Sequence, residues 1–245
     1  MSWQRDFFVG WAGRLPTEHA PWLRSAVAVA LGGFLLAGLL LSRAQDDPGG
    51  GTGASAEVTL DGVLTALPNP TLTLAAATSA APARTILLSG AGKMAPDFDA
   101  ALDGRTVRAT GYMLRRGALE MLQVTETLRR AETDLPAPPA RDLGTWRITG
   151  EICDGKCLAG AMRPGTGIAH RACANLCITS GVPPVFLATG PIEGQNHLLL
   201  GDPGGGPLAE RFRALTALHV TLEGVVEQRG DLLIFKPDLA GARVW

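Results

Sequence analysis

The chain has 245 residues, 46% of them hydrophobic, and a formal net charge of −1 at pH 7. It has no excess of basic side chains that would displace counterions from a polyanion, so we expect no nucleic-acid partner. Gly (31) and Pro (17) are abundant, which favours short strands joined by turns over a helical bundle. Outside the N-terminal region the composition therefore predicts a mainly β fold.

Residues 1–24 combine aromatic and basic side chains in the way that is typical of segments in the lipid headgroup layer. These side chains are Trp3, Phe7, Phe8 and Trp11 with Arg5 and Arg14. We interpret the segment as cytoplasmic and interfacial, with docking to a protein partner as the alternative.

Residues 25–42, SAVAVALGGFLLAGLLLS, contain no charged side chain. As a helix they would rise about 27 Å, close to the hydrocarbon thickness of a bilayer. A cleaved signal peptide is the alternative, but the apolar run exceeds the usual length of about 7 to 15 residues. Three arginines precede the run and Asp46 and Asp47 follow it, which predicts a cytoplasmic N-terminus. The pattern predicts a single-pass anchor in a bacterial inner membrane, with the remaining chain in the periplasm.

Two further segments read as connections. Residues 43–56 are Gly-rich and predict a flexible tether, and residues 134–143 are Pro-rich and predict a semi-stiff linker. They delimit two predicted domains, residues 57–133 and 144–245.

The two predicted domains carry the same pattern, V-x-x-x-G-x-x-x-x-R-G-x-L, in residues 107–122 and 220–235. Alternating apolar positions on either side of an Arg-Gly turn predict a β-hairpin in each. Gly62 and Gly111 are 49 positions apart, whereas Gly150 and Gly224 are 74 apart, so the second copy is longer by 25 residues. The extra residues fall between its first and second predicted strands.

Each copy reads as three strands, a short helical piece (residues 96–102 and 208–215) and a closing hairpin. This order resembles the OB-fold, a five-stranded barrel with a helix between its third and fourth strands. The resemblance implies two tandem OB-like barrels, the second with an insertion at residues 153–181. A fold of this kind assigns no ligand by itself.

The insertion contains every cysteine of the chain, as two C-x-x-x-C pairs with a histidine between them: Cys153, Cys157, His170, Cys173 and Cys177. Residues 168–178 predict a helix that places the histidine and the last two cysteines on one face. Outside a membrane, an even number of clustered cysteines is most simply oxidised to disulfides. The spacing resembles the twin CX3C arrangement of the small Tim chaperones, and that resemblance implies the pairs Cys153–Cys177 and Cys157–Cys173.

A metal site is the second interpretation of the same residues. Four thiolates, or a mixture of thiolates with His170 and Met162, suit zinc or copper(I). The set also resembles the copper ligands of the CuA domain of cytochrome oxidase and of Sco-type chaperones. A reactive dithiol is a third interpretation, although C-x-x-C is the usual redox spacing. His197 and His219 are expected to be structural, and Glu151 and Asp154 are expected to be solvated.

The blocks GEICDGKC, MRPG, HRACA and GVPP resemble those of bacterial membrane-anchored proteins to which no activity is attached. Two functions follow from these features. The first is a non-enzymatic accessory subunit of an inner-membrane respiratory or redox complex, with other membrane subunits and the bilayer as partners and no resident cofactor. The alternative is an electron-transfer protein or metallochaperone that holds copper, zinc or iron.

Overall fold

The computed structural model describes residues 17, 19–44, 56–76 and 83–245. The aromatic segment at residues 1–16 and the tether at residues 45–55 lie outside the described residues. The chain divides into two compact units, Met1–Pro48 and Gly49–Trp245.

The described part of the first unit contains the α-helix α1 at Ala20–Ala44. An 18-residue window within Ala20–Arg43 has a mean hydropathy of 2.1, and among the described residues α1 is the helix long and apolar enough to cross a membrane. The helix includes the whole of residues 25–42, so the predicted membrane-length helix is confirmed. Its 25 residues rise about 37 Å, slightly more than the hydrocarbon core of a bilayer.

The first half of the second unit is a six-stranded sheet in the order β1-β2-β3-β5-β4-β6, in which β1 also pairs with β4. Its elements are β1 (Glu57–Thr65), β2 (Thr71–Thr73), β3 (Thr85–Ser89), the 3₁₀ turn η2 (Ala100–Leu102), β4 (Thr106–Arg116), β5 (Leu119–Val124) and β6 (Arg129–Arg130). The strand β3 runs parallel to β5, and the other pairs in this sheet are antiparallel.

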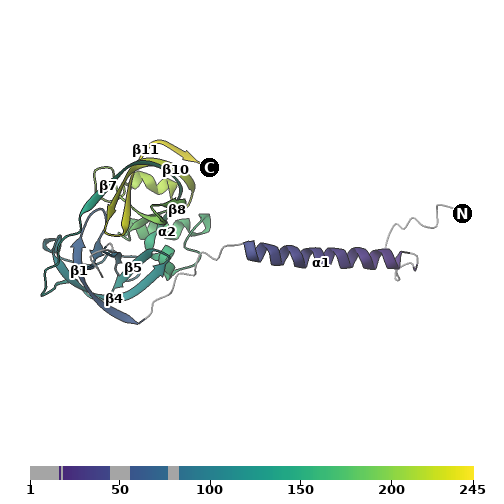
Figure 1. Ribbon diagram of the computed structural model, residues 1–245, viewed down its shortest axis with the longest axis horizontal. Coiled ribbons are helices and arrows are strands. Elements are labelled where there is room, and N and C mark those ends of the chain that lie inside the picture. Colours follow the sequence, from purple (N-terminus) through teal and green to yellow (C-terminus); the bar gives the residue numbers. More distant parts are fainter. Residues whose placement is uncertain (1–16, 18, 45–55, 77–82) are drawn as a thin grey trace. The chain divides into compact units, whose positions relative to one another are not determined.

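The second half is a closed barrel in the order β10-β11-β9-β8-β7. Figure 1 shows β7, β10 and β11 side by side in it. Its elements are β7 (Ala140–Asp154), β8 (Pro184–Ile192), β9 (Gln195–Leu200), the 3₁₀ turn η5 (Glu210–Leu215), β10 (His219–Arg229) and β11 (Leu232–Val244). Here the third and fifth strands, β9 and β11, form the parallel pair. The mainly β fold is therefore confirmed, and the order of strand pairing recurs in both halves.

Both predicted hairpins are present. In β4 and β5, Arg116 pairs with Leu119, and in β10 and β11, Arg229 pairs with Leu232, so each two-residue turn begins at the glycine of the Arg-Gly pair. The boundary of the second half differs from the prediction. The strand β7 begins at Ala140, because residues 140–142, assigned to the linker from sequence, pair with the end of β10.

The glycines shared by the two copies lie where neighbouring strands approach too closely for a side chain. A Cβ atom at Gly111 would lie 2.1 Å from the carbonyl oxygen of Gln123, and one at Gly224 would lie 2.3 Å from that of Lys236. Both contacts are to backbone atoms, which cannot move aside as a side chain can. The repeated glycine pattern thus has a steric cause in the tight crossing of the fourth and fifth strands.

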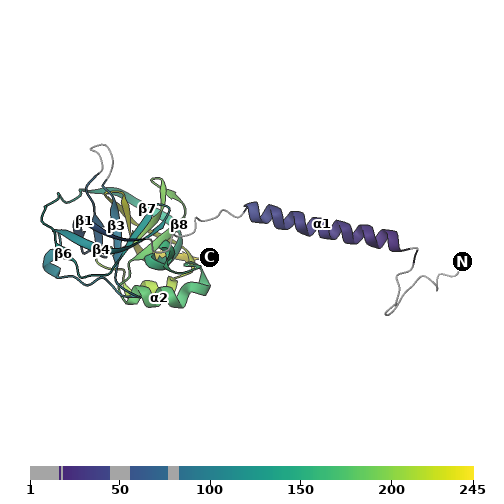
Figure 2. The ribbon, with the colours of Figure 1, turned by 90° about the horizontal axis from the view of Figure 1, so that it is seen from below.

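The cysteine insertion folds into three short helical pieces: η3 (Cys157–Ala161), η4 (Ile168–His170) and α2 (Arg171–Thr179). The predicted helix is confirmed, with its first residues in 3₁₀ form. It ends before Gly181, whose φ of +90° favours glycine. Figure 2 shows α2 along one edge of the β structure.

The insertion also joins the two halves. One hydrophobic cluster contains Leu87, Leu114 and Met121 of the first half together with Cys153, Cys157, Cys177 and Val185 of the second. Three of the four cysteines are therefore part of a core to which both halves contribute.

Candidate metal centre

The side chains that predicted a metal site lie together in two overlapping groups. The ligand atoms of Cys157, His170 and Cys173 all lie within 4.8 Å of one another, and so do those of Asp154, Cys157 and Cys177. The thiol of Cys157 belongs to both groups. The structure thus brings three of the four cysteines and the histidine to one place, and it adds a carboxylate that the sequence analysis did not include.

Asp154, the last residue of β7, forms hydrogen bonds with two residues of the cluster, Cys157 and His170. It is fully buried; one carboxylate oxygen accepts a hydrogen bond from the backbone N–H of Cys157 at 2.8 Å, and the other lies 3.0 Å from Nε2 of His170. The expectation that Asp154 is solvated was therefore wrong. The chain folds back at Gly155, whose N–H donates to the carbonyl of Pro183, and this turn carries the aspartate inward.

The contact between His170 and Asp154 decides which ring nitrogen of the histidine is available. A carboxylate oxygen accepts, so Nε2 carries a hydrogen atom, and in a neutral ring Nδ1 then has the free lone pair. Histidines that bind metals in proteins commonly donate their other N–H to a carboxylate in this way. With Nε2 bonded to Asp154, Nδ1 is the ring nitrogen left that could coordinate an ion.

Cys153 lies apart from both ligand groups. Its thiol is buried and donates to the carboxylate of Glu151 at 3.5 Å, and Glu151 also accepts from the backbone N–H of Gly167 at 2.6 Å. Burial and the negative charge of Glu151 raise the pKa of this thiol well above its usual value. Glu151 is half-buried and accepts from the loop before α2, so it is only partly solvated.

Two lysines complete the surroundings of the cluster. The ammonium group of Lys93 donates to the sulfur of Cys173 at 2.7 Å and to that of Cys177 at 3.5 Å. Lys156 is buried, and its ammonium group donates to the carbonyl oxygens of Gly90 and Gly92 at 2.7 Å each. Lys156 therefore fixes the loop that carries Lys93, and that loop belongs to the first half of the β unit.

Cys157 and Cys177 are buried thiols that share a hydrogen bond, and their surroundings shift their pKa values in opposite directions. The bond from Cys157 and the positive charge of Lys93 lower the pKa of Cys177 to about 7, against burial, which acts in the opposite direction. The same bond, burial and the nearby carboxylate of Asp154 raise the pKa of Cys157. The bond to Cys173 raises the pKa of Lys93, so that this lysine stays positively charged beside the sulfur atoms.

Met162 is the remaining ligand predicted from sequence. Its thioether sulfur lies 3.6 Å from the sulfur of Cys173, and the side chain is 47% exposed. It stands at the end of η3, on the side of the cluster that is open to solvent.

All four cysteines are free thiols in the structure. The pairs Cys153–Cys177 and Cys157–Cys173 stay a prediction about the oxidised protein.

Of the other histidines, His197 is buried, and burial together with the charge of Arg116 lowers its pKa to about 4. His219 lies exposed in β10. Neither belongs to a ligand group among the residues that the structure describes.

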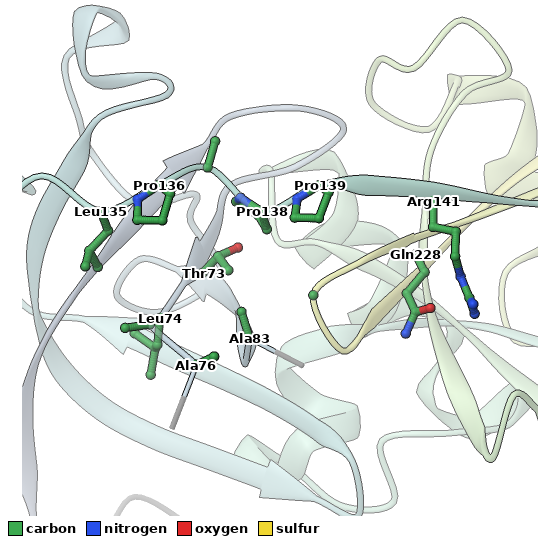
Figure 3. A pocket seen from close by; sticks show the side chains of 13 residues that line it. Thr73, Leu74, Ala76, Ala83, Leu135, Pro136, Pro138, Pro139, Arg141 and Gln228 are labelled. Atoms are coloured by element: carbon green, nitrogen blue, oxygen red, sulfur yellow. The ribbon is translucent and has the colours of Figure 1, made fainter. Parts of the chain in front are cut away.

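A separate pocket of about 600 Å³ lies between the linker and the strand ends of both halves. Figure 3 shows the side chains of Leu135, Pro136, Pro138 and Pro139 on one side of it and those of Leu74, Ala76 and Ala83 on another, with Arg141 and Gln228 at one end. Among the described residues that line it there is no thiol, imidazole or carboxylate. All four thiols of the chain lie in the cysteine insertion and not in this pocket.

The chain matches no protein-family model, no curated protein and no solved structure. Its function is therefore inferred from the geometry of the cysteine insertion.

Proposed function

We propose that this chain is a membrane-anchored protein whose cysteine insertion binds a soft metal ion, copper(I) or zinc. The observation that carries the proposal is the cluster of Cys157, His170 and Cys173, whose ligand atoms lie within 4.8 Å of one another. The ligands of one tetrahedral ion are separated by about 3.5 to 4 Å. Small rotations of side chains would therefore bring all three onto one ion, with Cys177 as a fourth ligand.

The groups around the cluster support a metal more than they support a disulfide-stapled loop. The bond between His170 and Asp154 orients an imidazole, which a disulfide would not require. The ammonium group of Lys93 lies beside two sulfur atoms and would offset the negative charge of a thiolate complex. A loop held by two disulfides needs neither a buried histidine nor a cation at its sulfur atoms.

The experiment that tests the proposal is metal analysis of the full chain, purified anaerobically in detergent, with a count of free thiols. We expect about one equivalent of copper or zinc, and loss of the metal in Cys157→Ser. The matched control is Cys153→Ser, which removes a thiol outside both ligand groups and should retain the metal. A protein that holds two disulfides and cannot be loaded with either metal after reduction would refute the proposal and favour the accessory subunit.

The proposed location is the periplasmic side of a bacterial inner membrane, with α1 as the anchor. The arginines before residue 25 and the aspartates after residue 45 support this orientation. Alkaline phosphatase fused after Trp245 should be active, because this enzyme needs an oxidising compartment. Activity of a cytoplasmic reporter alone at the same position would reverse the orientation.

The wider roles predicted from sequence are also proposals. Two OB-like barrels are supported by the recurrence of the same strand pairing in both halves, including the parallel pairs β3–β5 and β9–β11. Membership of a respiratory or redox complex is supported by the presence of a membrane-length helix and a soft-ligand cluster in one chain. Copurification of other membrane subunits with the tagged full chain would test it.

A further inference from the structure

The cluster is closed on one side and open on the other. Cys157, Cys177 and His170 are each 5% exposed or less, whereas Met162 is 47% exposed and Cys173 is half-buried. A metal ion that arrives from solvent reaches the cluster most directly at Cys173 and Met162. We name these two residues the exchange edge.

Met162 differs from the buried ligands in chemistry as well as in exposure. A thioether is a soft, neutral ligand that suits copper(I), while zinc in proteins is held by thiolate, imidazole and carboxylate. The Met162 sulfur lies 3.6 Å from the Cys173 sulfur, close enough for one ion to be shared between the two. The exchange edge is therefore better suited to bind copper(I) than zinc.

Three observations indicate that Met162 acts during exchange and is not a permanent ligand. The thiols of Cys157, Cys173 and Cys177 and the imidazole of His170 already offer four ligands, which is enough to hold the ion without a thioether. The contact that Met162 makes with the ligand groups is to Cys173, the most exposed cysteine. Its long, unbranched side chain can also follow an ion outward by rotation about several bonds.

We infer that copper(I) is cargo of this protein and passes through the exchange edge, where Met162 and Cys173 share the ion as it enters or leaves the buried ligands. This inference rests on the proposed metal-binding function. During release the bonds to Cys157, Cys177 or His170 break one at a time, while the ion keeps a bond to Cys173 and gains one to Met162. Each thiolate that the ion leaves takes up a proton from solvent, and each thiol gives one up when the ion enters. No electron is transferred, and the ion remains monovalent throughout.

The test measures copper(I) uptake and release by the full chain in detergent, under anaerobic and reducing conditions. Release is followed by transfer to a chromogenic copper(I) chelator, and uptake by the reverse reaction from the copper(I)–chelator complex. The variant is Met162→Leu, which keeps the volume of the side chain and removes its sulfur. We expect both rates to fall by a similar factor, on the order of tenfold, which corresponds to a barrier higher by about 1.4 kcal/mol, with little change in affinity.

Two controls belong to the experiment. Met94→Leu removes another exposed thioether, 61% exposed and outside the cluster, and should exchange copper(I) at the wild-type rate. Zinc transfer to a zinc chelator should proceed at the same rate in Met162→Leu and in the wild-type chain, because zinc gains nothing from a thioether.

The outcomes separate the inference from the proposed function. Unchanged rates in Met162→Leu, with one copper(I) still bound, would overturn the exchange edge and leave the metal site intact. Faster release with weaker affinity would make Met162 a resident ligand and would also overturn it. A wild-type chain that binds zinc but no copper(I) would overturn the inference alone, whereas one that binds neither metal would overturn the proposed function.

Discussion

Replacing Asp154 with alanine should destabilise the protein even when no metal is bound. The carboxylate is fully buried and accepts from two donors that are buried as well, the backbone N–H of Cys157 and the Nε2–H of His170. Each donor left without an acceptor costs about 1–3 kcal/mol of the free energy of unfolding. Two such losses are a large part of the roughly 5–15 kcal/mol by which domains are usually stable.

The assay is urea unfolding of the reduced, metal-free chain in detergent, followed by tryptophan fluorescence. Asp154→Asn should be intermediate between alanine and the wild type, since an amide oxygen can accept from one of the two donors but not replace the charge. The matched control is Asp134→Ala, which removes a carboxylate that is 69% exposed and bridges to Arg130 at 3.4 Å, and this change should cost less than about 1 kcal/mol. A loss in Asp154→Ala no larger than in the control would mean that water satisfies both donors, and the view of a dry, preorganised cluster would be wrong.

Three other predictions concern parts of the molecule that can be tested separately. His197 has a pKa of about 4 in the folded chain, below its ordinary value of 6.5, so between these values the unfolded chain binds a proton that the folded chain does not. The free energy of unfolding should therefore fall as the pH drops from 6.5 to 4, by up to about 1.4 kcal/mol per pH unit, and His197→Leu should flatten this slope in urea titrations. Gly224→Ala should cost about 1–3 kcal/mol because its Cβ would lie 2.3 Å from the Lys236 carbonyl oxygen, whereas Gly190→Ala, with no atom within 4 Å, should cost little. Native alkylation followed by mass spectrometry should modify the half-buried Cys173 first and Cys153 last; protection of all four cysteines that disappears only on reduction would instead favour the predicted disulfides.

The elements predicted well from sequence are those whose signals are local. The hairpins around Arg116 and Arg229 combine an Arg-Gly turn with alternating apolar residues, and both features lie within about fifteen positions. The helix that carries Cys173 and Cys177 has a similarly local pattern and a glycine stop at residue 181. The length of α1 follows from an uninterrupted apolar run.

The features missed from sequence depend on distant contacts. Lys93 lies 80 positions before Cys173 in a loop with no motif, and nothing near it in the chain indicates that its ammonium group reaches a sulfur atom. Asp154 was expected to be solvated because an isolated aspartate usually is. Its burial follows from the partners that His170 and the Cys157 N–H provide. One signal was available, since Asp154 and Lys156 stand between Cys153 and Cys157 at the end of a buried strand, where charged residues need partners.

The position of the insertion gives the first half of the β unit a role in the site. The insertion belongs to the second half by sequence, yet its buried Lys156 donates to two carbonyls of the loop after β3. The backbone N–H of Ala95 in that loop donates to the carbonyl of Ser180 just after α2. A Cβ atom at Gly181 would lie 2.8 Å from that of Ala95, so the two segments are in close contact. The loop in turn places Lys93 over Cys173 and Cys177. The first half, which has no cysteine of its own, therefore supplies the cation beside the sulfur atoms, and the cluster is complete only where the two halves meet.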